Sequence, residues 1–218
     1  MEFKDALNYR RSIRDFSDRP LAKETIKEII AEARRAPSWV NSQPWEVYVA
    51  TGKTLETIKE LHLEFSQRGL PGNSDLPFMH RDKMSPLARQ NAGAWSQALQ
   101  TFLGPDAEQM GSSQITLFNA PALVYLTLPK NTSAWSIYDL GAFGQTLMLA
   151  AAARKIDSIP AWEIVKYPSV VKNIMQIPDD KQLIIGIALG YRNQATKINV
   201  FYTERSEVDK FLTFKDSM

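Results

Sequence analysis

The sequence predicts an α+β fold. Helix-like and strand-like segments alternate irregularly, and strand-like segments are few for a chain of 218 residues. No Gly-x-Gly-x-x-Gly follows a strand, which disfavours a doubly wound nucleotide-binding fold. Hydrophobic residues make up 44% of the chain and charged residues 23%, enough to build a sizeable core. We expect a single domain over residues 1–218 with an elaborated insertion at about 66–112.

The first part of the chain is predicted to hold three helices and one strand. Residues 2–8 form a short helix, and an amphipathic helix with isoleucines at helical spacing then runs up to Pro37. Residues 46–50 have the pattern of a strand. A helix whose apolar residues extend from Leu55 to Phe65 follows this strand.

The last part of the chain alternates apolar strands with helices. A short strand or loop is expected at 156–163, a helix at 168–176 and a last short helix near 208–212. Two apolar runs predict buried strands, 122–128 and 182–191. The helix predicted at 136–155 is apolar almost all round, so we expect it to be buried inside the molecule or between subunits.

Residues 66–112 have the pattern of a lid, a binding loop or a locally helical insertion. Glycines and prolines open the segment, and residues 87–102 could carry one helix. Phe78, Met79, Trp95 and Phe102 would offer apolar surface to a flat substrate. The alternative is that the segment serves packing only.

Composition excludes several classes of function. The net charge of +2 gives no global attraction to nucleic acid or membranes. The absence of cysteine excludes disulfides and thiolate chemistry and is compatible with a reducing compartment. Charges stand where a signal peptide would be apolar, and no apolar stretch approaches the ~20 residues that span a bilayer. We expect a cytoplasmic protein that binds neither nucleic acid nor membrane.

The common catalytic and metal-binding motifs are missing from the sequence. His62 and His80 are the only histidines, and neither has metal-ligand spacing, so no metal site is expected. There is no Walker-type lysine loop and no Gly-x-Ser-x-Gly elbow. Gly186 and Gly190 lie inside a strand pattern and are better explained by packing.

Residues 9–16, Tyr-Arg-Arg-Ser-Ile-Arg-Asp-Phe, place three guanidinium groups and a hydroxyl within five residues. The planar fork of arginine donors suits phosphate oxygens and planar carbonyl edges. If this stretch is extended, Arg10, Ser12 and Arg14 share one face, while Arg11 and Ile13 share the other. The alternative is a solvated basic run.

Further polar fragments are separated from the arginine stretch in sequence. Each has a local explanation, such as a helix cap, a turn or a buried amide with a partner. Together with the arginines they suit a ligand with a phosphate at one end and a flat, hydrogen-bonding heterocycle at the other. These fragments are Ser38, Asn41 and Gln43 between two prolines, Gln145, Pro160–Glu163, and Arg205.

Seven segments resemble, in order, the nitroreductase family of FMN-dependent oxidoreductases. They cover most of the chain except roughly 66–112, and their combination is specific. The segments are RRSIRDF at 10–16, APSWVNSQPWEVYV at 36–49, APALVYL at 120–126, YDLGAFGQTLMLAA at 138–151, IDSIPAWEIVKYP at 156–168, IPDDKQLIIGIALGYR at 177–192 and the tail with Thr203 and Arg205.

The resemblance implies a central, mostly antiparallel sheet flanked by helices, and an intertwined homodimer with two FMN molecules at the subunit interface. Arg10, Ser12 and Arg205 would hold the phosphate, and Arg14 would lie near the pyrimidine edge. The loop 37–43 would come from the other subunit. The implied cofactor-binding residues are Arg10, Arg11, Ser12, Arg14, Pro37, Ser38, Trp39, Asn41, Gln43, Gln145, Pro160, Ala161, Trp162, Glu163 and Arg205.

The resemblance also implies which groups approach the flavin ring. Backbone groups of 160–163 would lie near N5 and O4. Many relatives have a small residue where Trp162 or Glu163 stands, so the backbone N–H that meets N5 is uncertain by one residue. No catalytic side chain is expected, because flavin N5 carries the chemistry.

The implied activity is a ping-pong reduction of nitroaromatics, quinones or similar electron-poor acceptors, with NADH or NADPH as donor. Alternatives with the same fold are a dedicated flavin reductase, a dehalogenase or an enone reductase. An alternative of another class is a flavin-binding protein with incidental diaphorase activity. The physiological acceptor and the preference between NADH and NADPH stay open.

Overall fold

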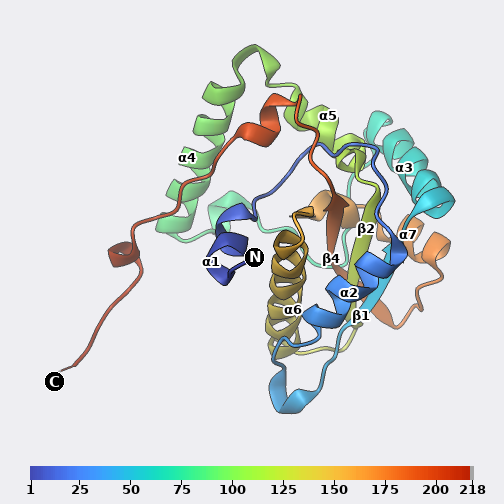
Figure 1. Ribbon diagram of the computed structural model, residues 1–218, viewed down its shortest axis with the longest axis horizontal. Coiled ribbons are helices and arrows are strands. Elements are labelled where there is room, and N and C mark those ends of the chain that lie inside the picture. Colours follow the sequence, from blue (N-terminus) through green and yellow to red (C-terminus); the bar gives the residue numbers. More distant parts are fainter. Residues whose placement is uncertain (217–218) are drawn as a thin grey trace.

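The computed structural model describes residues 1–216, and its centre is a four-stranded sheet with all neighbouring strands antiparallel. Figure 1 shows the sheet in the middle of the molecule. The strands lie in the order β1 (Glu46–Ala50), β2 (Ala122–Pro129), β4 (Lys181–Gly190) and β3 (Asp157–Ala161). The predicted α+β class and antiparallel sheet are therefore confirmed.

Helices cover both faces of the sheet, which explains why β2 is apolar throughout. Alternate residues of a strand point to opposite faces. Val124 and Leu126 pack with α2 (Lys23–Ala33) and α6 (Ala134–Ala153) on one face. Leu123 and Tyr125 pack with α3 (Gly52–Gln67) and α7 (Pro168–Met175) on the other.

The long apolar helix α6 buries only one face within the chain. Leu140, Phe143 and Leu147 lie in the core, whereas Trp135 and Tyr138 on another face are 72% and 71% exposed. Single exposed apolar residues are ordinary, but large aromatic side chains on an otherwise apolar helix mark an interaction surface.

The insertion and the C-terminal segment lie at the edge of the molecule. The helix expected at 87–102 is α4 (Pro86–Leu103), and α5 (Gln109–Ile115) follows it. Figure 1 shows α4 standing away from the sheet, with the C-terminal arm running past α4 to the far end of the molecule, while the short helix α1 (Phe3–Tyr9) packs on α6. The helix expected near 208–212 is only a 3₁₀ turn, Val208–Lys210.

A small separate core ties α4 to the C-terminal segment. Leu99 and Leu103 of α4 are buried together with Ile198. The Lys197 ammonium donates to the carbonyl of Leu103 at 3.0 Å. No helix within residues 1–216 is long and apolar enough to cross a lipid bilayer.

Candidate functional site

The arginine stretch lies alongside β3. The Ile13 amide donates to the carbonyl of Ser158 at 3.1 Å, and Ser12 forms a parallel bridge with Ser158. Ile13 is completely buried in the core that also contains Ile159. This apolar anchor fixes the extended backbone on which the charged side chains are mounted.

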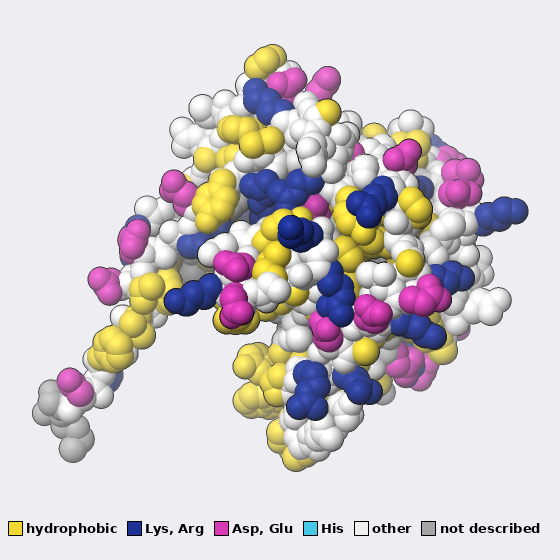
Figure 2. Space-filling view, viewed as in Figure 1, with side chains coloured by type: hydrophobic (Ala, Val, Ile, Leu, Met, Phe, Trp, Pro, Cys, Tyr) yellow, Lys and Arg dark blue, Asp and Glu magenta, His cyan; other side chains and the backbone are white. Residues whose placement is uncertain are grey.

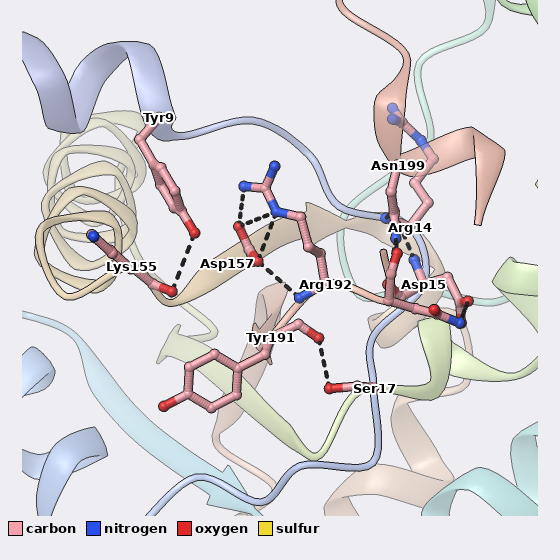
Figure 3. A network of polar contacts seen from close by, with 10 residues as sticks. Tyr9, Arg14, Asp15, Ser17, Lys155, Asp157, Tyr191, Arg192 and Asn199 are labelled. Atoms are coloured by element: carbon pink, nitrogen blue, oxygen red, sulfur yellow. Dashed lines mark hydrogen bonds and ion pairs between the residues drawn. The ribbon is translucent and has the colours of Figure 1, made fainter. Parts of the chain in front are cut away.

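Asn199 joins the C-terminal segment to the arginine stretch, as Figure 3 shows. Its side-chain oxygen accepts from the amides of Arg14 at 2.8 Å and Asp15 at 3.2 Å. Its side-chain nitrogen donates to the carbonyls of Asp15 and Asn193. Sequence reasoning did not assign Asn199 a role, and a partner 185 residues away leaves no local signal.

The Asn199 contacts hold the C-terminal segment so that Arg205 lies close enough to Arg10 to lower the pKa of Arg10. Burial lowers the pKa of Arg10, and the positive charge of Arg205 lowers that pKa further. Within residues 1–216, neither Arg10, Arg14 nor Arg205 forms an ion pair with a carboxylate. Two like charges held together without a counter-charge favour an anion between them.

Arg14 is the most deeply buried of these unpaired cations, with 9% of its surface exposed. Its guanidinium donates to the carbonyl of Ser12 at 3.2 Å and lies 5.7 Å from the ring centre of Trp95 on α4. Burial lowers the pKa of Arg14. Arginine carries five N–H donors, so most donors of Arg14 have no hydrogen-bond partner among the described residues.

Arg11 lies on the other side of the stretch, as the alternation predicts. Burial lowers its pKa first, and the nearby charge of Arg192 lowers it further. Its Nε atom is buried and has no hydrogen-bond partner among the described residues. The structure therefore places Arg11 with Arg192 and Asp157, and not with Arg10 and Arg205.

Arg192 is fully paired. Its Nε atom lies 3.1 and 3.0 Å from the two carboxylate oxygens of Asp157, and its amide donates to the same carboxylate at 2.8 Å. The Tyr9 ring lies 4.9 Å from its guanidinium carbon. These hydrogen bonds raise the pKa of Arg192 despite its partial burial. Figure 3 shows this pair beside the Asn199 contacts.

The segment Pro160–Glu163 continues from β3 into a 3₁₀ turn, Trp162–Val165. Ile164 packs directly on β4, where a Cβ at Gly186 would come within 2.2 Å of it. Gly186 is therefore required for packing, as expected, and it fixes where the 160–163 backbone runs.

The side chains of Trp162 and Glu163 are held away from the arginine stretch. Trp162 donates its ring N–H to Ser74 Oγ at 2.8 Å, at the start of the insertion. The Glu163 carboxylate contacts Lys166 Nζ at 2.9 Å and His62 Nε2 at 3.2 Å. Burial raises the pKa of Glu163, but these hydrogen bonds outweigh it and the net pKa is lowered. The side chains of Trp162 and Glu163 are therefore committed to these contacts, which leaves the backbone of the segment and the small side chains of Pro160 and Ala161 to contact a ligand beside β3.

The loop between Pro37 and Pro44 has a strained, closed backbone. Val40, Asn41 and Gln43 all have positive φ angles, which is costly for a β-branched residue such as Val40. The Gln43 amide donates to Ser38 Oγ at 3.0 Å and closes the loop. Ser38 thus holds the loop itself, while the side chains of Trp39 and Val40 stay 69% and 76% exposed.

The 37–43 loop is not part of the arginine cluster of its own chain. The Trp39 amide donates to the Asp139 carboxylate, near the beginning of α6, at 3.0 Å. The arginine stretch lies at the other end, where Tyr9 Oη donates to the carbonyl of Lys155. At about 1.5 Å per residue, Asp139 and the end of α6 at Ala153 are ~20 Å apart. Gln145 lies between them, on the exposed face of α6 that also carries Tyr138.

Comparisons with known proteins give a consistent result. The model of the family described as "Nitroreductase family" matches residues 7–191. The chloronitrobenzene nitroreductase of Comamonas testosteroni is 30% identical over 96% of this chain and 95% of its own length. An iodotyrosine deiodinase of Haliscomenobacter hydrossis is 36% identical over 87% of this chain and 79% of its own.

Among solved structures, the FMN-dependent nitroreductase NfnB of Mycobacterium smegmatis in complex with NADPH has a TM-score of 0.89 and 25% identity, covering 97% of both chains. The family match includes the arginine stretch, the 37–43 loop, α6 and the 160–163 turn. From this match and from the fold, the chain belongs to the nitroreductase family.

Proposed function

We propose that this protein is an FMN-dependent NAD(P)H oxidoreductase that reduces nitroaromatics, quinones or similar electron-poor acceptors. One observation carries the proposal: Arg10, Ser12 and Arg14 stand on one extended stretch, Arg205 is the charged neighbour of Arg10, and none of these three arginines has a carboxylate partner within residues 1–216. The chemistry of this donor set fits a phosphate joined to a planar ring system with carbonyl edges.

Different residues of the site suit different parts of FMN, according to the chemistry of each side chain. Arg10, Arg205 and Ser12 would bind the phosphate, and Arg14 would lie near the pyrimidine edge, which becomes negative on reduction. Backbone groups of 160–163 would lie near N5 and O4. When bound, FMN supplies the ability to take a hydride from a nicotinamide and pass electrons to the acceptor.

The proposal includes a homodimer whose site combines two chains. The 37–43 loop contacts α6 at Asp139 and the arginine stretch contacts the chain just after its other end at Lys155, and the ~20 Å of helix between these ends keeps loop and arginines from meeting around one ligand within a chain. A two-fold related copy could bring one chain's loop to the other chain's arginines. The exposed aromatic residues Trp39, Trp135 and Tyr138 supply the apolar surface that such a contact needs.

The C-terminal arm supports the same assembly. Figure 2 shows hydrophobic side chains along the projecting arm. Phe211, Leu212 and Phe214 are 67%, 42% and 82% exposed. An extended segment that exposes such residues is explained by packing on a partner chain. We also propose a cytoplasmic location, with which the absence of cysteine is compatible.

A dehalogenase is the second candidate, because the iodotyrosine deiodinase of Haliscomenobacter hydrossis is 36% identical over 87% of this chain. Steady-state assays with NADH or NADPH and a panel of a nitroaromatic, a quinone and an iodophenol separate the two. Turnover of the nitroaromatic and quinone supports the proposal, whereas exclusive deiodination supports the second candidate.

The binding part of the proposal is tested by the cofactor itself. The purified protein should be yellow and release FMN on denaturation, identified by chromatography. Release of FAD, or no flavin after reconstitution with FMN, contradicts the proposal.

A further inference from the structure

The insertion touches the proposed ring-binding arginine through one aromatic side chain. Trp95 projects from α4, and the Arg14 guanidinium carbon lies 5.7 Å from its ring centre. The Arg14 side chain has only one neutral hydrogen bond among the described residues, to the carbonyl of Ser12. A buried cation with so few partners depends on an aromatic face for its orientation.

The way in which α4 is attached shows that two different segments hold the backbone and the side chain of Arg14. Leu99 and Leu103 bury α4 against Ile198, in the segment that also carries Asn199. Asn199 in turn binds the backbone of Arg14 and Asp15. The backbone of Arg14 is therefore held by the C-terminal segment, while its guanidinium is held by the insertion.

We propose that Trp95 is a positioning residue for Arg14, through which the insertion adjusts the reduction potential of the bound flavin. This rests on the proposed function, because it requires FMN with its ring edge near Arg14. The expectation that Trp95 offers apolar surface to the acceptor stays a prediction, and its contact with Arg14 adds the positioning role proposed here.

The test is a spectroelectrochemical titration of the FMN-loaded Trp95→Leu variant. Loss of the aromatic face lets the guanidinium move, so the preference for reduced over oxidised FMN should fall about two- to fivefold. That is a decrease of ~10–20 mV in the two-electron potential. The affinity for oxidised FMN should change less than in Arg14→Gln.

The double variant Arg14→Gln/Trp95→Leu distinguishes positioning from a direct effect. If Trp95 acts through Arg14, the double variant has the potential of Arg14→Gln alone. Additive shifts would mean that Trp95 affects the flavin independently, which overturns the inference. If Trp95→Leu does not fold, Trp95→Phe takes its place, with a smaller shift that also vanishes in the Arg14→Gln background.

Phe102→Leu is the matched control on the same helix. The ring of Phe102 also lies 5.7 Å from a cation, the Lys197 ammonium. This ammonium is paired with Asp106, and it is not one of the proposed FMN-binding residues. The potential should stay at the wild-type value in this variant. Equal shifts in Phe102→Leu and Trp95→Leu would indicate a general effect of α4 and overturn the inference.

The outcomes also separate this inference from the proposed function. A wild-type protein that binds no FMN contradicts the proposed function. A protein that binds FMN, but whose potential is the same with Trp95 or leucine, overturns only the role of Trp95.

Discussion

Arg192 and Arg10 lie at the two sides of the arginine stretch 9–16, yet their guanidinium groups have opposite kinds of charged neighbour. Arg192 is bound by both oxygens of the buried Asp157, and this partner raises its pKa. Arg10 has a second arginine as its charged neighbour, and its pKa is lowered by burial and by that charge. The first arrangement is complete within the chain, whereas the second would be completed by the phosphate of the proposed function.

The difference teaches how to distinguish structural from ligand-binding charge. A buried charge is costly unless it is paired, so leaving the buried Arg14 and the half-buried Arg10 without a carboxylate must be compensated elsewhere. Here the compensation is expected from a bound phosphate. The same substitution, arginine to glutamine, should therefore affect folding at one position and ligand binding at the other.

The largest expected effect is that of Arg192→Gln on folding. The variant leaves Asp157 buried without its cation, and removing one partner of a buried pair costs about 3 kcal/mol. Urea denaturation of the FMN-free protein measures this loss. An unchanged midpoint would contradict the structural role of the pair.

Arg10→Gln should show the opposite behaviour. The stability of the FMN-free protein should stay within about 0.5 kcal/mol of wild type, because no ion pair is lost. FMN binding should weaken by about 2 kcal/mol, the size of a charge-assisted hydrogen bond. Fluorescence titration with FMN measures the binding, and a stability loss equal to that of Arg192→Gln would remove the distinction between the two arginines.

Arg14→Gln should affect the redox balance more than binding. A guanidinium near the ring edge that becomes negative stabilises the reduced form by roughly 1–2 kcal/mol after screening. The midpoint potential should therefore fall by about 20–45 mV. Spectroelectrochemistry measures it, with Arg10→Gln as the control that changes affinity and leaves the potential nearly constant.

Glu163→Gln extends the comparison to a paired charge just beyond the other end of β3 from Asp157, with the smallest effect. Since the folded-state pKa of Glu163 is lowered, its contribution to stability is complete above the unfolded pKa of about 4.3 and is lost as pH falls below that value. Glutamine keeps part of the hydrogen bonding, so the loss at neutral pH should be about 1 kcal/mol. Denaturation at several pH values should show a shallower acid dependence in the variant; an identical dependence would count against the lowered pKa.

Local patterns were sufficient for most secondary structure. The strand predicted at 46–50 is β1 to the residue, and the apolar runs at 122–128 and 182–191 are β2 and β4. The strands β2 and β4 are predictable because burial on both faces demands nearly continuous apolar residues. The alternation of the arginine stretch was also predictable, since Ile13 needs the core and its neighbours must point elsewhere.

Contacts between residues that are distant in the sequence could not be predicted from local patterns. No spacing in the sequence connects Trp95 with Arg14, or indicates that the carboxylate of Glu163 turns toward His62. The helix 136–155 illustrates the same limit, because apolar composition predicts burial without saying what covers each face.

By itself, the sequence determined the elements, the family resemblance and the residue types suited to a phosphate and a flat heterocycle, because hydrophobic period and side-chain chemistry are local properties. Only the tertiary structure decided which arginines are paired. Pairing depends on where residues such as Asp157, Asn199 and Arg205 are brought by chain segments that meet across the fold, and electrostatic energy depends on that distance and burial.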